Sequence, residues 1–245
     1  MSGIYEKAYQ LKSSDVNRWQ RLRTSVLMRW LQEAAIAHTE ELGMGRDKTL
    51  DRGILWIVSL QRTEILRMPV YDEKIIVRSW PGKTMHVFFP RYYELVSEDK
   101  QETLVRASAL WMLLDEKTRR FVFPDTYGIV IEGCMTGREA ALPASPKSLP
   151  LTEEKRFAVP FSYVDLNGHM NNTKYCDLAD DLLPFEKEGQ LLKMLSAEYL
   201  HEIREGQDVR LRWGFGEGTP SAFLTGEDEA GTALFRLRLE YAPHQ

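Results

Sequence analysis

The segment TSVLMRWLQEAAIAHTEEL, from Thr24 to Leu42, has the spacing of a long helix that is buried along one face. Its apolar positions recur every three or four residues, as they do on the inward face of an amphipathic helix. The residues on this expected face are Leu27, Leu31, Ala34, Ala35, His38 and Leu42. Thr24 or Ser25 is suited to begin the helix as its N-cap, and Gly43 is suited to end it. One long buried helix is therefore the first element that the sequence predicts.

Strand signals follow this helix with no second helix between them. They are runs of β-branched and aromatic residues separated by proline, glycine or charged turns. The runs lie at residues 54–58, 74–77, 86–95, 103–114 and 121–123. One long helix followed by successive antiparallel strands predicts an α+β fold, in which the helix packs into a concave sheet.

The same order of elements returns after a proline-rich stretch at residues 124–156. Beyond that stretch we expect a short strand at 157–163, a helix at 172–183, and strands at 192–203, 208–213, 221–226 and 233–241. A repeated order of elements indicates a duplication. The sequence thus predicts an N-terminal unit at residues 1–130, a linker at 131–156 and a C-terminal unit at 157–245.

Two short matches align the halves, segment 15–19 with 165–169 and segment 64–68 with 199–203. In this alignment the first unit has Trp19 where the second has His169. It also has Arg67 where the second has Glu202. An indole exchanges no proton at neutral pH and a guanidinium stays protonated, so we expect one working site per chain, in the second unit.

Composition and charge exclude several classes of protein. The 245 residues are 43% hydrophobic and 28% charged, with a net charge of −4, which is typical of a globular protein. The basic residues are scattered, so we expect no nucleic-acid partner. No apolar run is long enough for a membrane span or a signal peptide, and we expect a cytoplasmic protein. Cys134 and Cys176 lack zinc or redox spacing, so neither a metal nor a cofactor is expected.

The densest polar cluster is the octapeptide DLNGHMNN, which begins at Asp165 before the second expected helix. In an extended stretch, the side chains of Asp165, Asn167 and His169 point to the same side. Asn171 or Asn172 is suited to cap the helix, whose free N–H groups can stabilise an oxyanion. A carboxylate, a carboxamide, an imidazole and oxyanion donors in one place suit acyl transfer.

Glu202 adds a second carboxylate, since alternation along the strand at 192–203 is able to direct it to the concave side of the sheet. A surface glutamate paired with Arg204 is the alternative. The polar residues of the octapeptide likewise have an ordinary role open to them, in turn hydrogen bonds and a helix cap. Five polar groups within eight positions at one strand–helix junction favour the functional interpretation.

The stretch from Asp165 to Tyr175, DLNGHMNNTKY, resembles the Asp-x-Asn-x-His-x-Asn-Asn-x-Lys-Tyr motif of the acyl-acyl carrier protein (acyl-ACP) thioesterases. The likeness extends through segments 31–35, 106–111, 118–120 and 198–202, and so covers nearly the whole chain. It implies a tandem double hot-dog fold, with a long helix wrapped by an antiparallel sheet in each unit. It also implies a bacterial member that hydrolyses fatty acyl-ACP thioesters to free fatty acid and holo-acyl carrier protein in fatty acid biosynthesis.

Four residues match active-site positions of that family, namely Asp165, Asn167, His169 and Glu202. On this basis Glu202, helped by His169, would activate water or hold the catalytic network together, and Asn167 would orient it. Asp165 would either orient the network or attack the thioester carbonyl itself, and both roles stay open. Plant members carry a cysteine after the glutamate, whereas this chain has Ile203, so no thiol nucleophile is expected there.

The acyl chain is expected in an apolar tunnel between sheet and helix. Trp19 is expected either as an apolar wall near the tunnel or in plain core packing, and Asn171 and Asn172 are expected to contact substrate. Because acyl carrier protein is acidic, its docking surface here should be locally basic. The candidate basic residues are Arg18, Arg21, Arg23 and Lys174. The sequence leaves a homodimer open.

Two other functions stay open at this point. An acyl-CoA thioesterase would share the fold and the carboxylates, and the rates of hydrolysis on the two carriers would distinguish it. A non-catalytic acyl-binding protein on the same fold would bind ligand without turnover.

Overall fold

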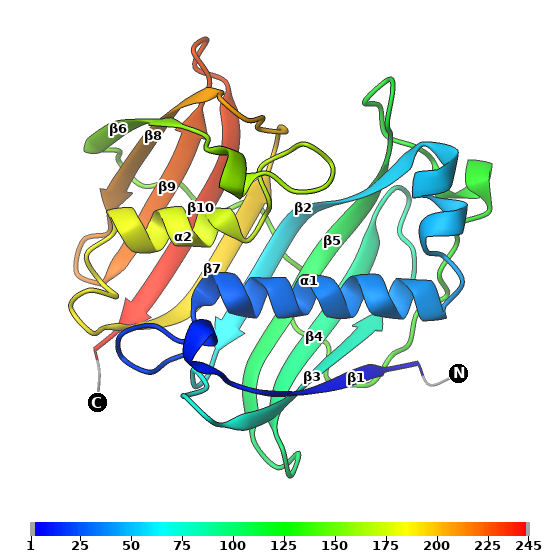
Figure 1. The fold of residues 1–245 in the computed structure, drawn as a ribbon, viewed down its shortest axis with the longest axis horizontal. Helices are drawn as coiled ribbons and strands as arrows, with labels where there is room; N and C mark the ends of the chain where they lie inside the picture. Colours follow the sequence, from blue (N-terminus) through cyan, green and yellow to red (C-terminus); the bar gives the residue numbers. More distant parts are fainter. Residues whose placement is uncertain (1–2, 244–245) are drawn as a thin grey trace.

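Two α-helices lie against one face of a single antiparallel sheet of ten strands (Figure 1). The computed structural model describes residues 3–243. The helices are α1 (Thr24–Glu41) and α2 (Lys174–Leu182), and the strands are β1 (Tyr5–Gln10), β2 (Ile54–Ile65), β3 (Lys74–Pro81), β4 (Phe89–Ser97), β5 (Thr103–Asp115), β6 (Glu153–Ala158), β7 (Leu191–Tyr199), β8 (Asp208–Phe215), β9 (Ser221–Glu227) and β10 (Ala233–Ala242). Within this described part of the chain, neither helix is both long and apolar enough to cross a membrane.

The strand order confirms the predicted duplication. From one edge to the centre it is β1-β3-β4-β5-β2, and from the other edge it is β6-β8-β9-β10-β7. Helix α1 follows β1, and α2 follows β6, at equivalent places in the chain. The two half-sheets join where β2 pairs with β7, from Leu60 opposite Glu198 to Glu64 opposite Met194. One continuous sheet therefore connects both units.

Helix α1 buries the face that its spacing predicts. Leu27 and Leu31 are almost completely buried and pack in the core between the helices and the sheet. Truncating such a leucine to alanine typically costs about 2–5 kcal/mol of stability. The helix ends before Gly43, whose φ of 69° is the left-handed conformation that glycine adopts freely. Its N-cap is Arg23 instead of the expected Thr24 or Ser25, and the side chain of Arg23 makes no capping hydrogen bond.

The edges of the sheet differ from the sequence prediction. Strand β1 was not predicted, and β6 begins at Glu153, inside the stretch interpreted as a linker. Both are edge strands with mostly exposed side chains, so they show no apolar alternation. Residues 121–123 form no strand and contribute only a bridge between Phe121 and Leu114.

The segment between the units crosses the sheet face opposite the helices. The hydroxyl of Ser108 on β5 donates to the Ala141 carbonyl at 2.6 Å. Farther along, the Ser145 hydroxyl donates to Glu198 Oε1 on β7, also at 2.6 Å. Ala107 and Ala197, the neighbours of these strand residues, point into the core, so the polar contacts lie on the outer face.

Candidate active site

The predicted polar cluster forms a tight loop just before α2. The backbone N–H of Asp165 donates to the His169 carbonyl at 2.9 Å, and the N–H of Gly168 donates to the Asp165 carbonyl at 3.0 Å. Asp165 Oδ1 also accepts the backbone N–H of Asn167 at 2.8 Å. Gly168 has a φ of 78°, which explains why glycine stands at this turn. A closed turn, rather than the extended stretch expected, therefore brings the polar side chains together.

Asp165, Asn167 and His169 all line one cavity of about 510 Å³, together with Glu202. The first unit contributes the ends of β2 and β5 to its walls, through residues such as Trp56 and Met112. The second unit contributes the loop, the start of α2 and the segment after β7. All four residues that match the family motif thus share one cavity between the units.

His169 and Glu202 form a close polar pair in this cavity, with Nε2 3.1 Å from Oε2. Main-chain contacts fix their separation, because the N–H of Met170 donates to the Ile203 carbonyl at 2.7 Å. The other carboxylate oxygen, Oε1, accepts a hydrogen bond from Arg119 Nη1 at 2.9 Å. Within residues 3–243, Glu202 has ion-pair partners in His169 and Arg119 but not in Arg204, its expected alternative partner.

The surroundings favour the neutral form of His169. Burial lowers the pKa of this imidazole, and the positive charges of Arg119 and Arg204 lower it further. Glu202 and Asp165 act in the opposite direction. The Glu202 carboxylate favours a proton on the nearby Nε2, and a neutral ring with that proton carries its lone pair on Nδ1. Nδ1 is therefore the ring nitrogen able to accept a proton.

Arg119 is the residue of this site that the sequence did not assign to it. It follows β5 in the first unit, in a turn where Asp115 Oδ1 accepts the N–H groups of Lys117 and Thr118. Only the charged turn residues 115–120 mark this position in the sequence. Nothing local indicates that their side chains reach the second unit.

A second cavity, of about 410 Å³, runs along α1. Its wall follows the helix from Gln32 to Glu40, which corresponds to about 12 Å at 1.5 Å per residue. Apolar groups form much of the lining, including Ala35, Ile54 and Phe89. The two cavities share the lining residues Trp56, Asp165, Asn167 and Asn172, so they meet at the loop of residues 165–172.

The three residues expected to contact substrate lie in different surroundings. Asn172 lines both cavities, and no hydrogen bond engages its side chain within residues 3–243. Asn171 lines the cavity along α1, but its Oδ1 accepts the N–H of Thr173 at 3.0 Å. Trp19 lines neither cavity: its indole is 41% exposed and donates to the Glu186 carbonyl at 3.0 Å. The expected tunnel wall is thus a surface contact.

Hydrogen bonds of the two loops correct the alignment that led to Trp19. The N–H of Asn17 donates to the Arg21 carbonyl at 2.8 Å, as that of Asp165 donates to the His169 carbonyl. The N–H of Trp19 donates to the side chain of Asn17 at 3.0 Å, as that of Asn167 donates to Asp165. Arg21 is therefore the counterpart of His169, two residues beyond the residue expected from the matching Asp and Asn letters.

The segment around Glu202 needs a smaller correction. The N–H of Arg67 donates to the Leu104 carbonyl, as that of His201 donates to the Leu234 carbonyl. Met68 is consequently the counterpart of Glu202, instead of Arg67. The first unit has neither a histidine nor a carboxylate at these two positions, so the expectation of one site per chain keeps its basis.

The cysteines are not placed as nucleophiles. Cys176 is buried on α2, and burial raises the pKa of its thiol well above the ordinary value. Cys134 is half-buried and lines neither cavity among the described residues. Both thiols are free. No group of three or more His, Cys, Asp or Glu side chains arranged to hold a metal occurs in residues 3–243.

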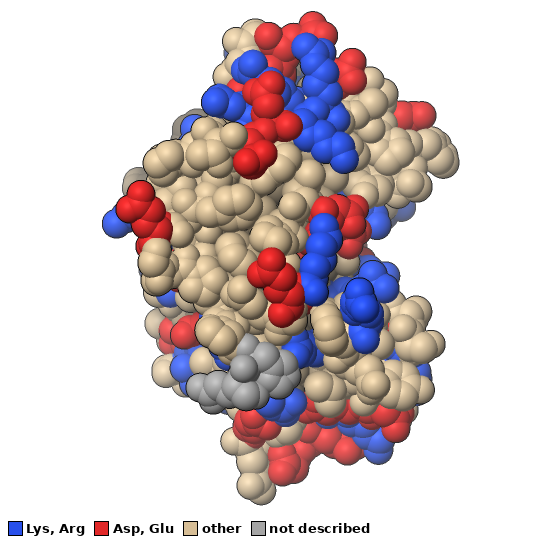
Figure 2. Space-filling model, turned by 90° about the vertical axis from the view of Figure 1, so that its left-hand side faces the viewer, with Lys and Arg blue, Asp and Glu red and all other residues tan. Residues whose placement is uncertain are grey.

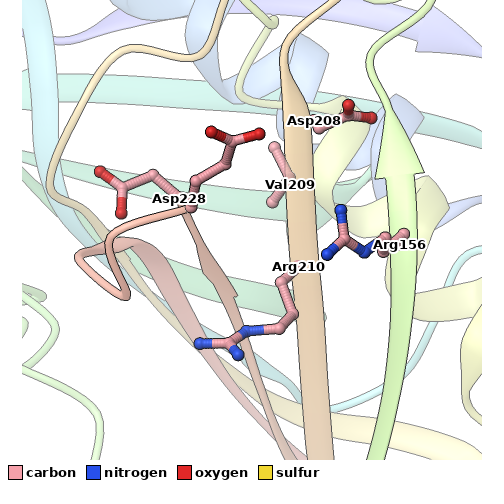
Figure 3. Close-up of a pocket in the computed structure, with 6 residues that line it drawn as sticks. Arg156, Asp208, Val209, Arg210 and Asp228 are labelled. Carbon is pink, nitrogen blue, oxygen red and sulfur yellow. The ribbon is translucent and has the colours of Figure 1, made fainter.

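A further hollow, of about 170 Å³, lies on β6 and β8 beside the turn between β9 and β10 (Figure 3). Its lining includes Arg156 and Arg210 together with Asp208 and Asp228. None of its lining residues lines either of the two cavities that meet at the loop of residues 165–172. Its lining carries charges of both signs, with Glu229 as a third carboxylate, and we assign it no part in the site.

Comparison with known proteins places this geometry in a family. The model of the acyl-ACP thioesterase N-terminal domain matches residues 2–125, and that of the C-terminal domain matches residues 147–228. A palmitoyl-acyl carrier protein thioesterase of Cuphea hookeriana is 24% identical over 98% of this chain. The chain spans 62% of that relative's length.

Solved structures have the same tandem double hot-dog fold. An acyl-ACP thioesterase from Bacteroides thetaiotaomicron superposes with a TM-score of 0.83 at 19% identity, covering 99% of this chain and 100% of the other. The 12:0-ACP thioesterase from Umbellularia californica also gives 0.83, at 20% identity, covering 100% of this chain and 99% of the other. With two family models matching most of its length, the chain belongs to the acyl-ACP thioesterase family.

Proposed function

We propose that this chain hydrolyses fatty acyl-ACP thioesters to free fatty acid and holo-acyl carrier protein. One observation carries the proposal: Asp165 and Asn167 lie where a largely apolar cavity along α1 meets a cavity that holds the His169–Glu202 pair. A fatty acyl thioester has an apolar chain on one side of its carbonyl and a polar pantetheine arm on the other. The two cavities offer a place for each, with the carbonyl at their junction.

The acyl chain would occupy the cavity along α1. Burial of each methylene there contributes about 0.8 kcal/mol, which makes binding sensitive to chain length. The pantetheine arm would lie in the other cavity, beside polar groups such as Ser59 and His201. In this arrangement the carbonyl faces Asp165, Asn167 and Asn172.

The hydrolytic step follows from the neutral state of His169. Nδ1 accepts a proton from water as the water oxygen attacks the thioester carbonyl. The tetrahedral intermediate then breaks its C–S bond, and the imidazolium returns the proton to the thiolate, leaving a fatty acid and a free thiol. Glu202 stabilises the imidazolium and fixes the tautomer. Its Oε1 already accepts a hydrogen bond from Arg119 and its Oε2 lies 3.1 Å from His169 Nε2, so we favour this role over that of the base.

We assign the oxyanion to the side-chain amide of Asn172, because it faces both cavities without another partner among residues 3–243. Donors at the start of α2 are already used in part. The N–H of Thr173 donates to Asn171 Oδ1, and that of Lys174 donates to the Asn171 carbonyl. The expected helix-start donors are thus less available than the sequence indicates.

Asp165 keeps two roles open, as an orienting group or as a nucleophile that forms a transient anhydride. Oxygen-18 distinguishes an orienting Asp165 from an anhydride that water opens at the aspartyl carbonyl, whereas an anhydride opened at the fatty acyl carbonyl also leaves Asp165 unlabelled. In a single turnover in ¹⁸O-water, an orienting Asp165 stays unlabelled and all the new oxygen enters the fatty acid. Label in the peptide that contains Asp165 would instead support the anhydride.

The function is tested with the purified chain and a panel of acyl-ACP and acyl-CoA substrates of different lengths. We expect equal amounts of free acid and free thiol, with a higher kcat/KM for carrier-bound chains. His169→Ala serves as the matched inactive control. Higher rates on acyl-CoA would favour the acyl-CoA thioesterase, and binding without turnover would favour the non-catalytic acyl-binding protein.

The proposed partner is the acidic carrier protein. Of the basic residues considered for its docking, Arg21 donates to the Gly189 carbonyl, Arg23 donates to the Val16 carbonyl and Lys174 pairs with Asp177. Arg18 is exposed and lies over the ring of Trp19. On the face shown in Figure 2, acidic and basic side chains are intermixed, so we do not propose docking there. A homodimer and a cytoplasmic location stay predictions, as do the unit boundaries at residues 130 and 157.

A further inference from the structure

Arg119 belongs to the first unit but contacts the carboxylate of Glu202 in the second. Its Nη1 lies 2.9 Å from Glu202 Oε1, while the opposite oxygen of that carboxylate lies 3.1 Å from His169 Nε2. The side chain of Arg119 is 34% exposed, that of Glu202 is 30% exposed and that of His169 is 12% exposed. The three groups therefore form one row that leads from the rim of the cavity to its interior.

The turn that carries Arg119 is held rigidly. Asp115 Oδ1 accepts three hydrogen bonds, from the N–H of Lys117 and from the N–H and hydroxyl of Thr118. The N–H of Arg119 donates to the Asp115 carbonyl at 2.9 Å. Arg119 itself has a φ of 56°, a conformation that non-glycine residues rarely adopt. Backbone strain of this kind persists where the surrounding structure determines it, and it often occurs at functional sites.

We propose that Arg119 is a positioning residue of the hydrolytic site, which holds the Glu202 carboxylate in the orientation that places Oε2 beside His169 Nε2. The proposal rests on the proposed function, because it assigns Glu202 and His169 their roles. It also means that the first unit takes part in the chemistry of the second, although it has Arg21 and Met68 at the positions that correspond to His169 and Glu202. Arg119 touches no reacting atom in this arrangement and acts only through Glu202.

Orientation is the main effect that we expect. A glutamate has three side-chain torsions, and one that is partly exposed can leave a single hydrogen bond for water. A guanidinium on the opposite oxygen restricts that freedom, because charge-assisted hydrogen bonds are short and directional. Small misplacements of catalytic groups cost up to about 100-fold in rate. Loss of Arg119 should therefore lower kcat while KM changes little.

Charge gives a second effect with a defined sign. Four charged groups act on His169, namely Glu202 and Asp165, which raise its pKa, and Arg119 and Arg204, which lower it. Removing the positive charge of Arg119 should consequently raise the pKa of His169. Because neutral His169 is the active form, the acid limb of the pH–rate profile should move to higher pH.

Arg119→Gln tests the proposal, with Arg120→Gln as the matched control. Arg120 is the next residue in the same turn, is exposed, and lines neither cavity within the described chain. Both variants lose one positive charge, but only the first loses the contact with Glu202. The melting temperature of each variant shows whether it folds. Arg119→Lys keeps the charge but has one nitrogen in place of the planar guanidinium, and it serves if the glutamine variant does not fold.

For Arg119→Gln we expect kcat to fall about 10- to 100-fold with KM nearly unchanged. We also expect an upward shift of the His169 pKa, measured by NMR on protein with labelled histidine and assigned with His169→Gln. Arg119→Lys should recover part of kcat and most of the wild-type pKa, and Arg120→Gln should behave as wild type. A folded Arg119→Gln protein with wild-type kcat and wild-type His169 pKa would overturn the proposal, as would an equal effect of Arg120→Gln.

The titration separates failure of this inference from failure of the proposed function. NMR reports the His169 pKa in the free protein, without any substrate. A wild-type chain that hydrolyses no thioester would refute the proposed function. An unchanged His169 pKa in Arg119→Gln, together with unchanged turnover, would refute the role of Arg119 alone.

Discussion

His169 Nε2 lies 3.1 Å from Glu202 Oε2, although α2 and β7 separate the two residues in the chain. The pair forms because main-chain hydrogen bonds join the loop of residues 165–172 to the segment that follows β7. Backbone contacts therefore hold the two segments beside each other, and substitution of either side chain should leave the fold in place.

Glu202→Gln should lower kcat by roughly 100- to 10,000-fold, because His169 loses the carboxylate that fixes its tautomer and stabilises its imidazolium. The Glu202 charge raises the pKa of His169, so its removal should move the acid limb of the pH–rate profile to lower pH, opposite to the shift in Arg119→Gln. Rates measured from pH 4 to 9 test both effects. Exposed Glu205→Gln is the control. A shift to higher pH would contradict the charge assignment.

Cys176→Ala should retain most of the activity. The thiol is buried, and its raised pKa leaves almost no thiolate at neutral pH, so it serves in packing. Steady-state rates and alkylation of the native protein by iodoacetamide test this prediction. Rapid alkylation of Cys176 that abolishes turnover, or a folded but inactive alanine variant, would revive a thiol mechanism.

Ala35→Leu should shift the released acids to shorter chains. Ala35 is buried on α1 and lines the proposed acyl cavity, so a larger side chain removes space from it. Each methylene that no longer fits forfeits about 0.8 kcal/mol, or about fourfold in binding. Half-buried Ala37→Leu, on the same helix but outside both cavities, is the control. An unchanged product profile for a folded Ala35→Leu protein would argue against this location of the chain.

Asp180→Asn should change how stability depends on pH. Burial, together with the negative charges of Glu186, Asp177 and Asp181, raises the pKa of Asp180 from 3.8 to about 8. A raised carboxyl pKa stabilises the fold at low pH, and this contribution is lost as pH rises from about 4 through 8, by at most about 1.4 kcal/mol per pH unit. Asparagine carries no proton to lose. Urea unfolding at pH 5, 7 and 9 should therefore show the variant gaining on wild type as pH rises.

The matched control for this titration is Glu188→Gln, at an exposed position nearby. It should follow the wild-type curve throughout. A constant difference between Asp180→Asn and wild type at all three pH values would show that the Asp180 carboxyl is not protonated in the fold.

Salt should weaken hydrolysis of carrier-bound chains more than hydrolysis of acyl-pantetheine. Charges on a carrier surface are screened over about 10 Å at 0.1 M salt and over about 3 Å at 1 M. Acyl-pantetheine has no such surface, so it serves as the control for the carrier-bound substrate. Equal loss of kcat/KM for both substrates between 0.05 and 0.5 M sodium chloride would count against electrostatic docking.

The parts of the fold that the sequence reveals are those that bury one face. Helix α1 shows its apolar residues at helical spacing because that face packs in the core. Edge strands β1 and β6 bury little on either side, and their side chains are mostly exposed, so no alternation marks them. Hydrophobic periodicity reports burial, and an element without burial leaves no such pattern.

The candidate site divides in a similar way. Asp165, Asn167 and His169 are close in sequence and lie on one loop, so a local motif reveals them. Arg119 reaches Glu202 across 83 positions of the chain, and no local pattern carries that contact. The register error at Trp19 has another cause: identical Asp and Asn letters outweighed the turn geometry, which alone defines equivalent positions.

The pairing of β2 with β7 keeps the first unit next to the candidate site of the second unit. Because both half-sheets belong to one chain, the first unit is tethered beside the loop of residues 165–172. Its position there does not depend on association with a separate subunit in solution. Two identical subunits would have to carry every substitution twice, once at each symmetry-related position. Tethered halves are free of that constraint. One of them holds Arg21 and Met68 where the other holds His169 and Glu202, and it still supplies walls of the cavity and the guanidinium that contacts Glu202.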